Sequence, residues 1–315
     1  MNRRELLGAG LILSGAALAG TAGRAAARPF FARHRLAIGV QLYTLDPDLD
    51  RDFDGTLAKL ARIGFRSVEM AGFHGHSAAD LRRAFDAHGL RCTSAHIQPS
   101  GRGNGPSFAD HDALIRAMHT IGVTDVILPI PLFPQDFRAP AQTNAGDGFR
   151  LSGRAMKAGD WRRTAAFLND QAKALAPHGL RVGYHNHNFG FAPLAHTIGL
   201  EILLRETDPK TVAFEMDVGW VAAAGHDPIA LLKAHPGRFT QMHVKDIKAS
   251  TKPNFEVRQD PTEVGSGEIA WRRILPVAYA AGVRRFYIEQ EPPFPGPRID
   301  SVAKSFRYLT GLVTA

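Results

Sequence analysis

Short apolar segments with the character of β-strands alternate along this chain with longer amphipathic segments, and this alternation limits the fold more than any other feature. Eight candidate strands cover residues 36–45, 67–73, 91–98, 125–133, 180–191, 211–218, 239–247 and 285–290. Eight helical patterns cover residues 52–63, 78–88, 108–121, 160–176, 194–205, 228–234, 269–281 and 299–312. Strict alternation favours a parallel sheet, and eight such units in roughly 280 residues predict a single closed (β/α)8 TIM barrel of the α/β class.

Glycines mark the ends of several predicted helices. Gly64, Gly89, Gly122, Gly179 and Gly282 each lie between a helical pattern and the next apolar segment. Glycine readily adopts the left-handed conformation that ends a helix, so these positions strengthen the helix boundaries. An open doubly wound sheet is the alternative to a barrel, but no Gly-x-Gly-x-x-Gly motif follows the first predicted strand, which weakens it.

The first 27 residues have the composition of an export signal. Arg3 and Arg4 precede a weakly hydrophobic stretch rich in Gly and Ala, and the alanines at 25–27 form a candidate cleavage site. We predict a twin-arginine signal peptide at 1–27 and a barrel domain at 28–315, and therefore an exported, periplasmic protein that uses the twin-arginine export machinery. The alternative is a membrane anchor, but the apolar stretch is shorter than the ~20 residues that a span needs. We expect no membrane span in the mature chain.

The formal net charge of +8 invites a nucleic-acid interpretation. The predicted signal holds three arginines and one glutamate, so the mature chain carries about +6, without a run of Lys and Arg interleaved with aromatic residues. A solvated surface therefore explains the charge better, and we expect no nucleic-acid partner. The single cysteine, Cys92, excludes an intrachain disulfide framework and a cysteine-rich metal site. None of these features predicts an oligomeric state.

Ionisable side chains gather where the predicted strands end, and the carboxyl ends of barrel strands are where catalytic groups lie. Strand two ends in Glu69 and strand three in His96. The later strands end in pairs: strand five in His185 and His187, strand six in Glu215 and Asp217, strand seven in His243 and Lys245, and strand eight in Glu289 and Glu291. Side chains two positions apart share one face of a strand, so each pair can direct at least one member towards the barrel mouth. The loops at 134–159 and 247–267 follow strands four and seven, where sites and lids are built.

Four of these residues form a candidate metal site. Strands five to eight are neighbours in a barrel and can supply His185, Asp217, His243 and Glu289 to one point. Imidazole and carboxylate ligands suit a divalent cation such as Mn, Co, Ni, Zn or Mg.

Each of these side chains also has a structural interpretation. A single histidine at a strand end is more often hydrogen-bonded than metal-binding, and Glu69 could be an ion-pair partner at the barrel bottom. Glu215 could lie one layer below the site and orient a ligand. We expect Asp246 to face away from the site and to cap a loop. The presence of such a side chain at the end of each of four neighbouring strands is harder to explain if each residue has only an independent structural role.

Several motifs resemble the xylose isomerase-like barrel superfamily, whose members are often described as sugar phosphate isomerases/epimerases. The resemblance extends from GVQLY at 39–43 to FYIEQ at 286–290 and is most specific in GYHNHNF at 183–189, EMDVGW at 215–220, HVKD at 243–246 and EVGSGEI at 263–269. It implies a metal held by four residues at the ends of strands five to eight. Asp217, His243 and Glu289 match that set in type. His185 stands where the ketose epimerases of the family have a first glutamate, so their mechanism with two paired glutamate bases does not transfer unchanged.

The resemblance implies metal-assisted enolisation of a carbonyl substrate. Glu289 or His187 would remove the carbon-bound proton, and Lys245 would stabilise the enediolate. Substrate contacts are expected from Glu69 and His96 to hydroxyl groups and from the rings of Tyr43 and Trp220, together with Phe73, to C–H faces.

We therefore expect a metal-dependent sugar isomerase or epimerase that acts on a sugar or keto-sugar through an enediolate. The main alternative is a metal-dependent lyase, dehydratase or hydratase that acts on a 3-keto-glycoside or related keto-sugar. Export favours an unphosphorylated small-molecule sugar as the substrate. A phosphodiesterase and a non-catalytic sugar-binding barrel are weaker alternatives, because the first needs a basic DNA-binding face and the second does not need the ligand-type residues.

Overall fold

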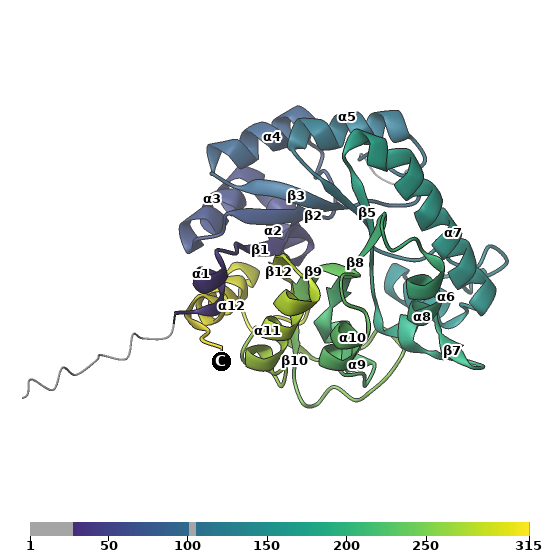
Figure 1. The fold of residues 1–315 in the computed structure, drawn as a ribbon. Coiled ribbons are helices and arrows are strands. Elements are labelled where there is room, and N and C mark those ends of the chain that lie inside the picture. Colours follow the sequence, from purple (N-terminus) through teal and green to yellow (C-terminus); the bar gives the residue numbers. More distant parts are fainter. Residues whose placement is uncertain (1–27, 101–104, 315) are drawn as a thin grey trace, which may run out of the picture.

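The computed structural model describes residues 28–100 and 105–314, and it is a closed barrel of eight parallel strands surrounded by helices, as the alternation predicts (Figure 1). The strands are β1 (Ile38–Gln41), β2 (Ser67–Met70), β3 (Arg91–His96), β4 (Asp125–Leu128), β5 (Arg181–His185), β8 (Val212–Asp217), β9 (Phe239–Val244) and β12 (Arg285–Ile288). Neighbours in this order pair with each other, and β1 closes the barrel against β12 with Val40 opposite Ile288.

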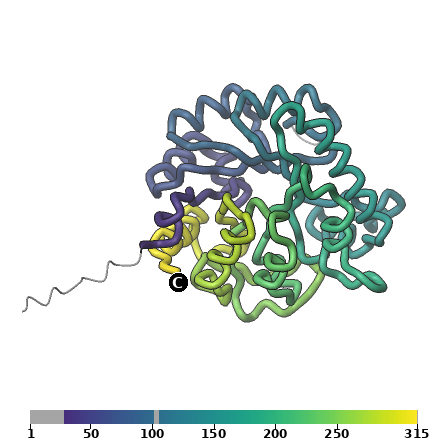
Figure 2. The backbone as a smooth tube through the Cα atoms, in the orientation of Figure 1, coloured from purple at the N-terminus to yellow at the C-terminus, as the bar shows by residue number. Residues whose placement is uncertain are grey.

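Eight outer helices correspond to the eight predicted ones. They are α3 (Phe53–Ile63), α4 (Ala78–Ala87), α5 (His111–Ile121), α7 (Ala158–Leu175), α8 (Gly199–Glu206), α10 (Pro228–Ala234), α11 (Trp271–Ala281) and α12 (Arg298–Gly311). The described chain begins with α1 (Phe30–His34), which lies beside α12 because the backbone N–H of Phe30 donates to the carbonyl of Leu312 at 2.8 Å (Figure 2).

The predicted glycine stops are present in the structure. Gly64, Gly89, Gly122, Gly179 and Gly282 all have positive φ angles, between 63° and 121°. A residue with a Cβ is strained in this region of conformation, which explains glycine at these five positions. The helix starts are capped in the complementary way; for example, the Ser77 hydroxyl accepts from the backbone N–H of Asp80 at 3.2 Å.

Several connections are more structured than predicted. The stretch at 134–159, expected as a loop, contains helix α6 (Ala145–Arg154), which begins after the N-cap Asn144. The predicted helix at 194–205 begins only at Gly199, because β6 (Pro193–Leu194) and β7 (Thr197–Ile198) form a small hairpin before it. Short capped elements of this kind lack the long apolar repeat on which the prediction relies.

The predicted strands are also too long at their carboxyl ends. Apolar residues beyond these ends enter η1 (Leu42–Leu45), η3 (Asn188–Phe191) and α9 (Val218–Ala223). Two further short helices are α2 (Asp46–Arg51), which follows η1, and η2 (Ala176–His178), which precedes β5. Helix α9 starts directly after β8 because the Asp217 carboxylate accepts from the backbone N–H of Trp220 at 2.9 Å.

Side chains fill the barrel interior, and many of them are polar. The Tyr287 ring of β12 reaches Thr93 of β3 across the interior, with 3.3 Å between the two hydroxyl oxygens. Gly39 leaves room for this ring, because a Cβ there would lie 2.4 Å from Tyr287. Ser94 similarly joins Gln241 of β9 at 3.2 Å. Small residues on some strands thus admit large or polar side chains from others, which is how a barrel of this size fills its centre.

Asp246 lies outside the barrel mouth and organises the loop that returns to α11, as predicted. It begins β10 (Asp246–Ile247), which pairs with β11 (Pro261–Thr262). Its buried carboxylate accepts hydrogen bonds from the backbone N–H groups of Gly265 (2.8 Å) and Ile269 (3.2 Å) and from Nε1 of Trp271 (2.9 Å). One carboxylate therefore fixes three separate points of the return loop.

We expect Asp246→Ala to lower the free energy of unfolding by roughly 2–4 kcal/mol, because the substitution leaves several buried N–H donors without a partner. Urea unfolding followed by tryptophan fluorescence measures the loss. Asp86→Ala is a matched control on the exposed face of α4, where Asp86 pairs only with Arg82. Equal stability of the two variants would contradict the assigned role of Asp246.

Within the described ranges, no helix has both the length and the hydropathy required to cross a bilayer. The predicted export signal at 1–27 lies outside these ranges and stays a prediction.

Candidate active site

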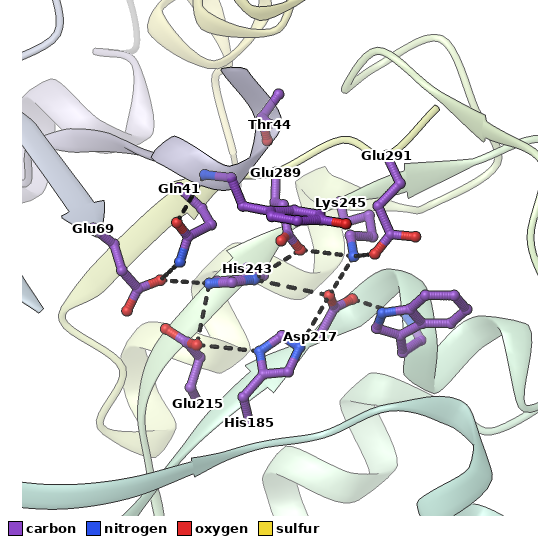
Figure 3. Close-up of polar contacts among 12 residues, drawn as sticks. Gln41, Thr44, Glu69, His185, Glu215, Asp217, His243, Lys245, Glu289 and Glu291 are labelled. Carbon is purple, nitrogen blue, oxygen red and sulfur yellow. Dashed lines mark hydrogen bonds and ion pairs between the residues drawn. The ribbon is translucent and has the colours of Figure 1, made fainter. Parts of the chain in front are cut away.

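The carboxyl ends of six strands bring ionisable side chains into one cluster at the barrel mouth. Figure 3 shows those from β2, β5, β8, β9 and β12. Strands β2, β3, β5, β8, β9 and β12 contribute, directly or from the residue after the strand, Glu69, His96, His185, Glu215, Asp217, His243, Lys245, Glu289 and Glu291. All of these except His96 and Glu291 are buried. Most of the candidate site residues are therefore neighbours in space.

His243 lies at the centre of the cluster and contacts a carboxylate through each ring nitrogen. Its Nδ1 is 2.9 Å from Oε2 of Glu289, and its Nε2 is 2.6 Å from Oε2 of Glu69 and 3.1 Å from Oε2 of Glu215. Burial opposes a charge on the ring, but Glu215 and Glu289 outweigh it and raise the pKa of His243 well above its ordinary value. In the metal-free protein, His243 is therefore an imidazolium ion.

Glu215 gathers three imidazole rings around one carboxylate oxygen. Its Oε2 lies 2.9 Å from Nε2 of His96, 3.1 Å from Nδ1 of His185 and 3.1 Å from Nε2 of His243. Burial alone would raise the pKa of Glu215, but His243 and the other two histidines lower it well below its ordinary value. Glu215 is thus an ionised carboxylate that fixes the orientation of three rings, in line with the predicted orienting role.

His185 is the neutral member of this group. Burial is the main cause that lowers its pKa to about 3, and the positive charges of His243 and His96 act in the same direction. Its Nδ1 faces Glu215, which leaves Nε2 directed towards Oδ2 of Asp217 at 3.8 Å. A neutral imidazole with one free nitrogen is the form that binds a metal.

Lys245 forms the opposite side of the cluster. Its buried ammonium lies 2.9 Å from Oδ2 of Asp217, 2.7 Å from Oε2 of Glu289 and 2.9 Å from Oε1 of Glu291. It also lies 4.9 Å from the centre of the Trp220 ring. Burial opposes this charge, but the three carboxylates raise the pKa of Lys245 well above its ordinary value. Lys245 is therefore a fixed cation that holds Asp217 and Glu289 in place.

These donors fit a divalent cation. Ligand atoms of Asp217, His243 and Glu289 lie within 4.8 Å of one another, as do those of a second set, His96, His185, Glu215 and His243. Oδ2 of Asp217 is buried and accepts no well-directed hydrogen bond, although the Lys245 ammonium lies nearby. The five carboxylates of the cluster outnumber its two cations, Lys245 and His243, so the cluster has room for further positive charge. Imidazole and carboxylate donors of this kind suit Mn, Co, Ni or Zn, with Mg less favoured by the imidazoles.

We expect the affinity for a divalent metal to rise as the pH increases from about 6 to about 8. Burial and the Glu289 charge raise the pKa of Asp217 to about 7, against the effect of Lys245. Below that pH the Asp217 carboxyl holds a proton, so a metal that binds must displace it. One displaced proton gives roughly a tenfold change in affinity per pH unit. Chelator competition at several pH values measures the slope, and an affinity that falls as the pH rises would contradict this assignment.

A cavity of about 670 Å³ borders the cluster at the barrel mouth. His96, His185 and Glu289 form part of its wall, together with His187 and Trp220. Burial lowers the pKa of His187 well below its ordinary value, so this ring is neutral, and its Nδ1 is buried without a hydrogen-bond partner. The His187 ring packs nearly parallel to Phe189, with 5.5 Å between the ring centres. The inner part of the cavity therefore combines the Glu289 carboxylate and two neutral imidazoles, those of His185 and His187, with aromatic walls.

The structure distributes the predicted contact residues between two places. Tyr43, His96, His187 and Trp220 line the cavity, as substrate or catalytic contacts require. Glu69 does not line it; it is wholly buried and accepts hydrogen bonds from Gln41 (2.9 Å) and Ser94. Lys245, Asp217 and His243 also lie behind the wall. The structure therefore does not place Glu69 or Lys245 in direct contact with a sugar in this cavity.

Helix α6 and the loop before β11 contribute residues that the sequence analysis did not identify. Asn144, Asp147, Phe149 and Arg150 line the cavity from the region of α6, and Glu256, Val257 and Arg258 line it from that loop. Arg150 joins the two regions through an ion pair with Glu256 at 2.7 Å. The only signal in the sequence was the length of the two connections, because nothing in their composition indicates which side chains turn towards the barrel.

Comparison with known proteins identifies the family. Residues 57–312 match the family described as xylose isomerase-like TIM barrel, and the chain belongs to this family. Its fold is similar to that of a sugar phosphate isomerase/epimerase from Parabacteroides distasonis, with a TM-score of 0.68 and 25% identity over 88% of this chain and 94% of the other.

Two curated relatives are similar over parts of the chain. One is an inosose dehydratase of Lactiplantibacillus plantarum, with 35% identity over 92 residues, which is 29% of this chain and 30% of the relative. The other is the rhizopine catabolism protein MocC of Rhizobium meliloti, with 27% identity over 228 residues, 68% of this chain and 65% of the relative. The matched regions thus span less than two thirds of either relative.

Proposed function

We propose that this protein is a metal-dependent enzyme that enolises a keto-sugar or related polyhydroxy ketone. The observation that carries the proposal is the set of Asp217, His243 and Glu289, completed by the neutral His185. His185 and Glu289 form part of the wall of the cavity, and the other two lie directly behind it. A divalent cation held by these four residues would supply the Lewis acidity that makes a proton next to a carbonyl group removable. The family and the names of its relatives support a sugar-like substrate.

The residues around this site have separate tasks in such a reaction. Glu289 is the carboxylate that both faces the cavity and belongs to the metal set, so it is the candidate base for the carbon-bound proton. Burial would raise the pKa of Glu289, but Lys245 and His243 lower it well below its ordinary value, which keeps the group ionised. Lys245 and Glu215 act as positioning residues, because each contacts at least two members of the set.

His187 determines how the reaction ends. The C–H bond electrons pass into the enediolate when Glu289 takes the proton. If His187 then delivers a proton to the same carbon from the other face, the product is the epimer. If a proton goes instead to a hydroxyl or alkoxy group on the adjacent carbon, that group leaves as water or alcohol and the product is an unsaturated ketone. The neutral His187 ring beside the cavity can serve either step once it takes up a proton from solvent, and Glu289 returns to solvent the proton that it removed from carbon.

Epimerisation or isomerisation is the first candidate, and elimination is the second. The similarity to a sugar phosphate isomerase/epimerase across most of both chains favours the first. The second is favoured by the inosose dehydratase relative, whose name describes removal of water from a polyhydroxy ketone.

Proton exchange in deuterated water tests this function. The manganese-loaded protein is incubated with an inosose, a ketohexose and a 3-keto-glucoside, and each compound is followed by proton NMR. Deuterium at the carbon beside the carbonyl without loss of a group indicates an isomerase or epimerase, and an unsaturated product or released alcohol indicates a lyase or dehydratase. Metal-stripped protein is the control. Exchange that is equally fast without metal, or absent with every polyhydroxy ketone of the panel, would contradict the proposal.

We also propose that residues 1–27 direct export through the twin-arginine machinery and are then removed. The support is the sequence of that segment alone. Fractionation of the cells of origin, followed by N-terminal sequencing, is the test, with Arg3→Lys/Arg4→Lys as the variant expected to stay in the cytoplasm. A periplasmic protein that keeps Met1 would contradict removal, and an unaffected double variant would contradict the twin-arginine route.

A further inference from the structure

The cavity is larger than one sugar ring requires. A hexose has about twelve non-hydrogen atoms, and even at the roughly 30 Å³ that each water molecule occupies in the liquid these atoms would take up about 360 Å³. The cavity measures about 670 Å³. The lining residues that would hold the metal or move protons, His185, His187 and Glu289, lie on its inner wall, next to the buried cluster. About half of the cavity therefore lies beyond the reacting ring.

The outer part of the cavity contains an exposed aromatic ring, that of Tyr43. Tyr43 lines the cavity and is 47% exposed, and within the described ranges it is the one large hydrophobic side chain that is exposed. Its position is fixed, because its backbone N–H donates to Oε1 of Gln41 at 3.1 Å while Nε2 of the same amide donates to Glu69 at 2.9 Å. A buried amide thus anchors the backbone of Tyr43 at the mouth, and the exposed part of the Tyr43 ring is available to a ligand.

Helix α6 provides a second aromatic wall from another part of the mouth. It follows β4, which is three strands away from β1 in the barrel, so Phe149 and Tyr43 enter the cavity from different directions. The Phe149 ring packs edge-on against His187 at 5.2 Å and against Phe133 at 5.6 Å. The ion pair of Arg150 with Glu256 holds this helix against the neighbouring loop. The outer walls are therefore organised before a ligand binds.

The charge of the outer part disfavours an anionic ligand. Asp46, Asp147, Glu256 and Glu291 line the cavity together with two arginines, Arg150 and Arg258. Arg150 is already paired with Glu256 at 2.7 Å and Asp147 at 3.4 Å. A phosphate group would meet more carboxylates than free guanidinium groups, so an uncharged group with apolar faces fits better.

We propose that the outer part of the cavity, between Tyr43 and Phe149, binds the aglycone or second ring of an uncharged glycoside, while the keto-sugar ring occupies the inner part. The proposal rests on the function proposed above and names its substrate class. An apolar ring face that packs on an exposed aromatic side chain gains roughly 0.5–1.5 kcal/mol beyond the area that it buries, which is up to about tenfold in affinity.

Binding and turnover together test this inference. Calorimetry with the manganese-loaded protein compares glucose, phenyl β-glucoside and glucose 6-phosphate, and turnover compares 3-keto-glucose with its phenyl β-glycoside. We expect the phenyl compounds to be favoured about tenfold over the free sugars, and glucose 6-phosphate to bind no tighter than glucose. Tyr43→Ala should reduce the preference for the phenyl compounds to near unity, whereas Tyr43→Phe, which keeps the ring, should retain it.

The two readouts separate this inference from the proposed function. Absence of a preference for the phenyl compounds, or a preference that Tyr43→Ala leaves intact, would overturn the outer subsite. Tighter binding of glucose 6-phosphate would overturn the choice of an uncharged ligand. If the phenyl preference appears in binding and is lost in Tyr43→Ala while neither keto compound exchanges protons, the subsite stands and the enolising function fails.

Discussion

Replacing His243 with alanine is expected to weaken divalent-metal binding by at least about 100-fold. His243 is wholly buried, and its two ring nitrogens contact three carboxylates, Glu69, Glu215 and Glu289, so its loss removes the ligand at the centre of the cluster. Loss of a residue that only orients a ligand typically costs 10–100-fold in affinity, and loss of a ligand costs more. Competition with a fluorescent chelator gives the dissociation constants of the wild type and the variant.

His111→Ala is a matched control for this experiment. His111 is a partly buried histidine at the start of α5, where it contacts Gln171 at 2.6 Å and no carboxylate of the cluster. Its loss should leave the metal affinity within about twofold of the wild type, because it removes an imidazole without touching the barrel mouth. Equal metal affinities for His243→Ala and the wild type would show that the metal, if bound, lies elsewhere.

Glu289→Gln is expected to slow proton exchange of the substrate by roughly 10²–10⁴-fold, the usual contribution of a general base. The amide keeps an oxygen that can face His243 and Lys245, but it cannot accept a proton from carbon. The metal affinity should therefore fall much less than the rate. Single-turnover deuterium incorporation measures the rate, and chelator competition with the same preparation measures the metal.

Glu263→Gln is the corresponding control, because Glu263 is also a buried carboxylate but bonds to Ser301 (2.9 Å) and Lys304 (3.1 Å) on the outside of the barrel. Its exchange rate should stay close to that of the wild type. If Glu289→Gln exchanges protons as fast as Glu263→Gln, the base is another group, and His187 becomes the first alternative.

The sequence was sufficient to predict the barrel for a physical reason. Its strands are buried on both faces, so they appear as short apolar runs, whereas the helices bury one face and repeat with a longer period. Glycines such as Gly122 and Gly282, both with positive φ, mark where one unit ends. Helix α6 was not predicted because it has few buried residues and therefore no clear apolar repeat. Its start depends on a single cap, Asn144.

The candidate site could be predicted only in part. Periodicity and strand ends were enough to bring His185, Asp217, His243 and Glu289 together, because parallel strands deliver their carboxyl ends to one rim. The role of each residue depends on the positions of side-chain atoms, and sequence periodicity gives no information about these positions. The convergence of three imidazoles on one oxygen of Glu215 needs the barrel to close.

From the sequence, His185 is expected to stand where ketose epimerases have a first glutamate, and this replacement stays a prediction. The structure gives His185 a neutral ring, oriented by Glu215, with Nε2 directed at Asp217. A neutral imidazole in place of a carboxylate leaves a bound divalent ion with one more unit of positive charge, which makes it a stronger Lewis acid. The same exchange removes a base, and His187 is the remaining neutral group on the cavity wall that can take over proton transfer on that side.

Crystallography of the manganese-soaked protein tests the metal site most directly. Diffraction data collected above and below the manganese absorption edge locate the ion without any assumption about the substrate. We predict one dominant anomalous peak within about 2.3 Å of Nδ1 of His243, Oδ2 of Asp217, an oxygen of Glu289 and Nε2 of His185. No peak at the barrel mouth, or a dominant peak at histidines on the outer helices, would contradict the account.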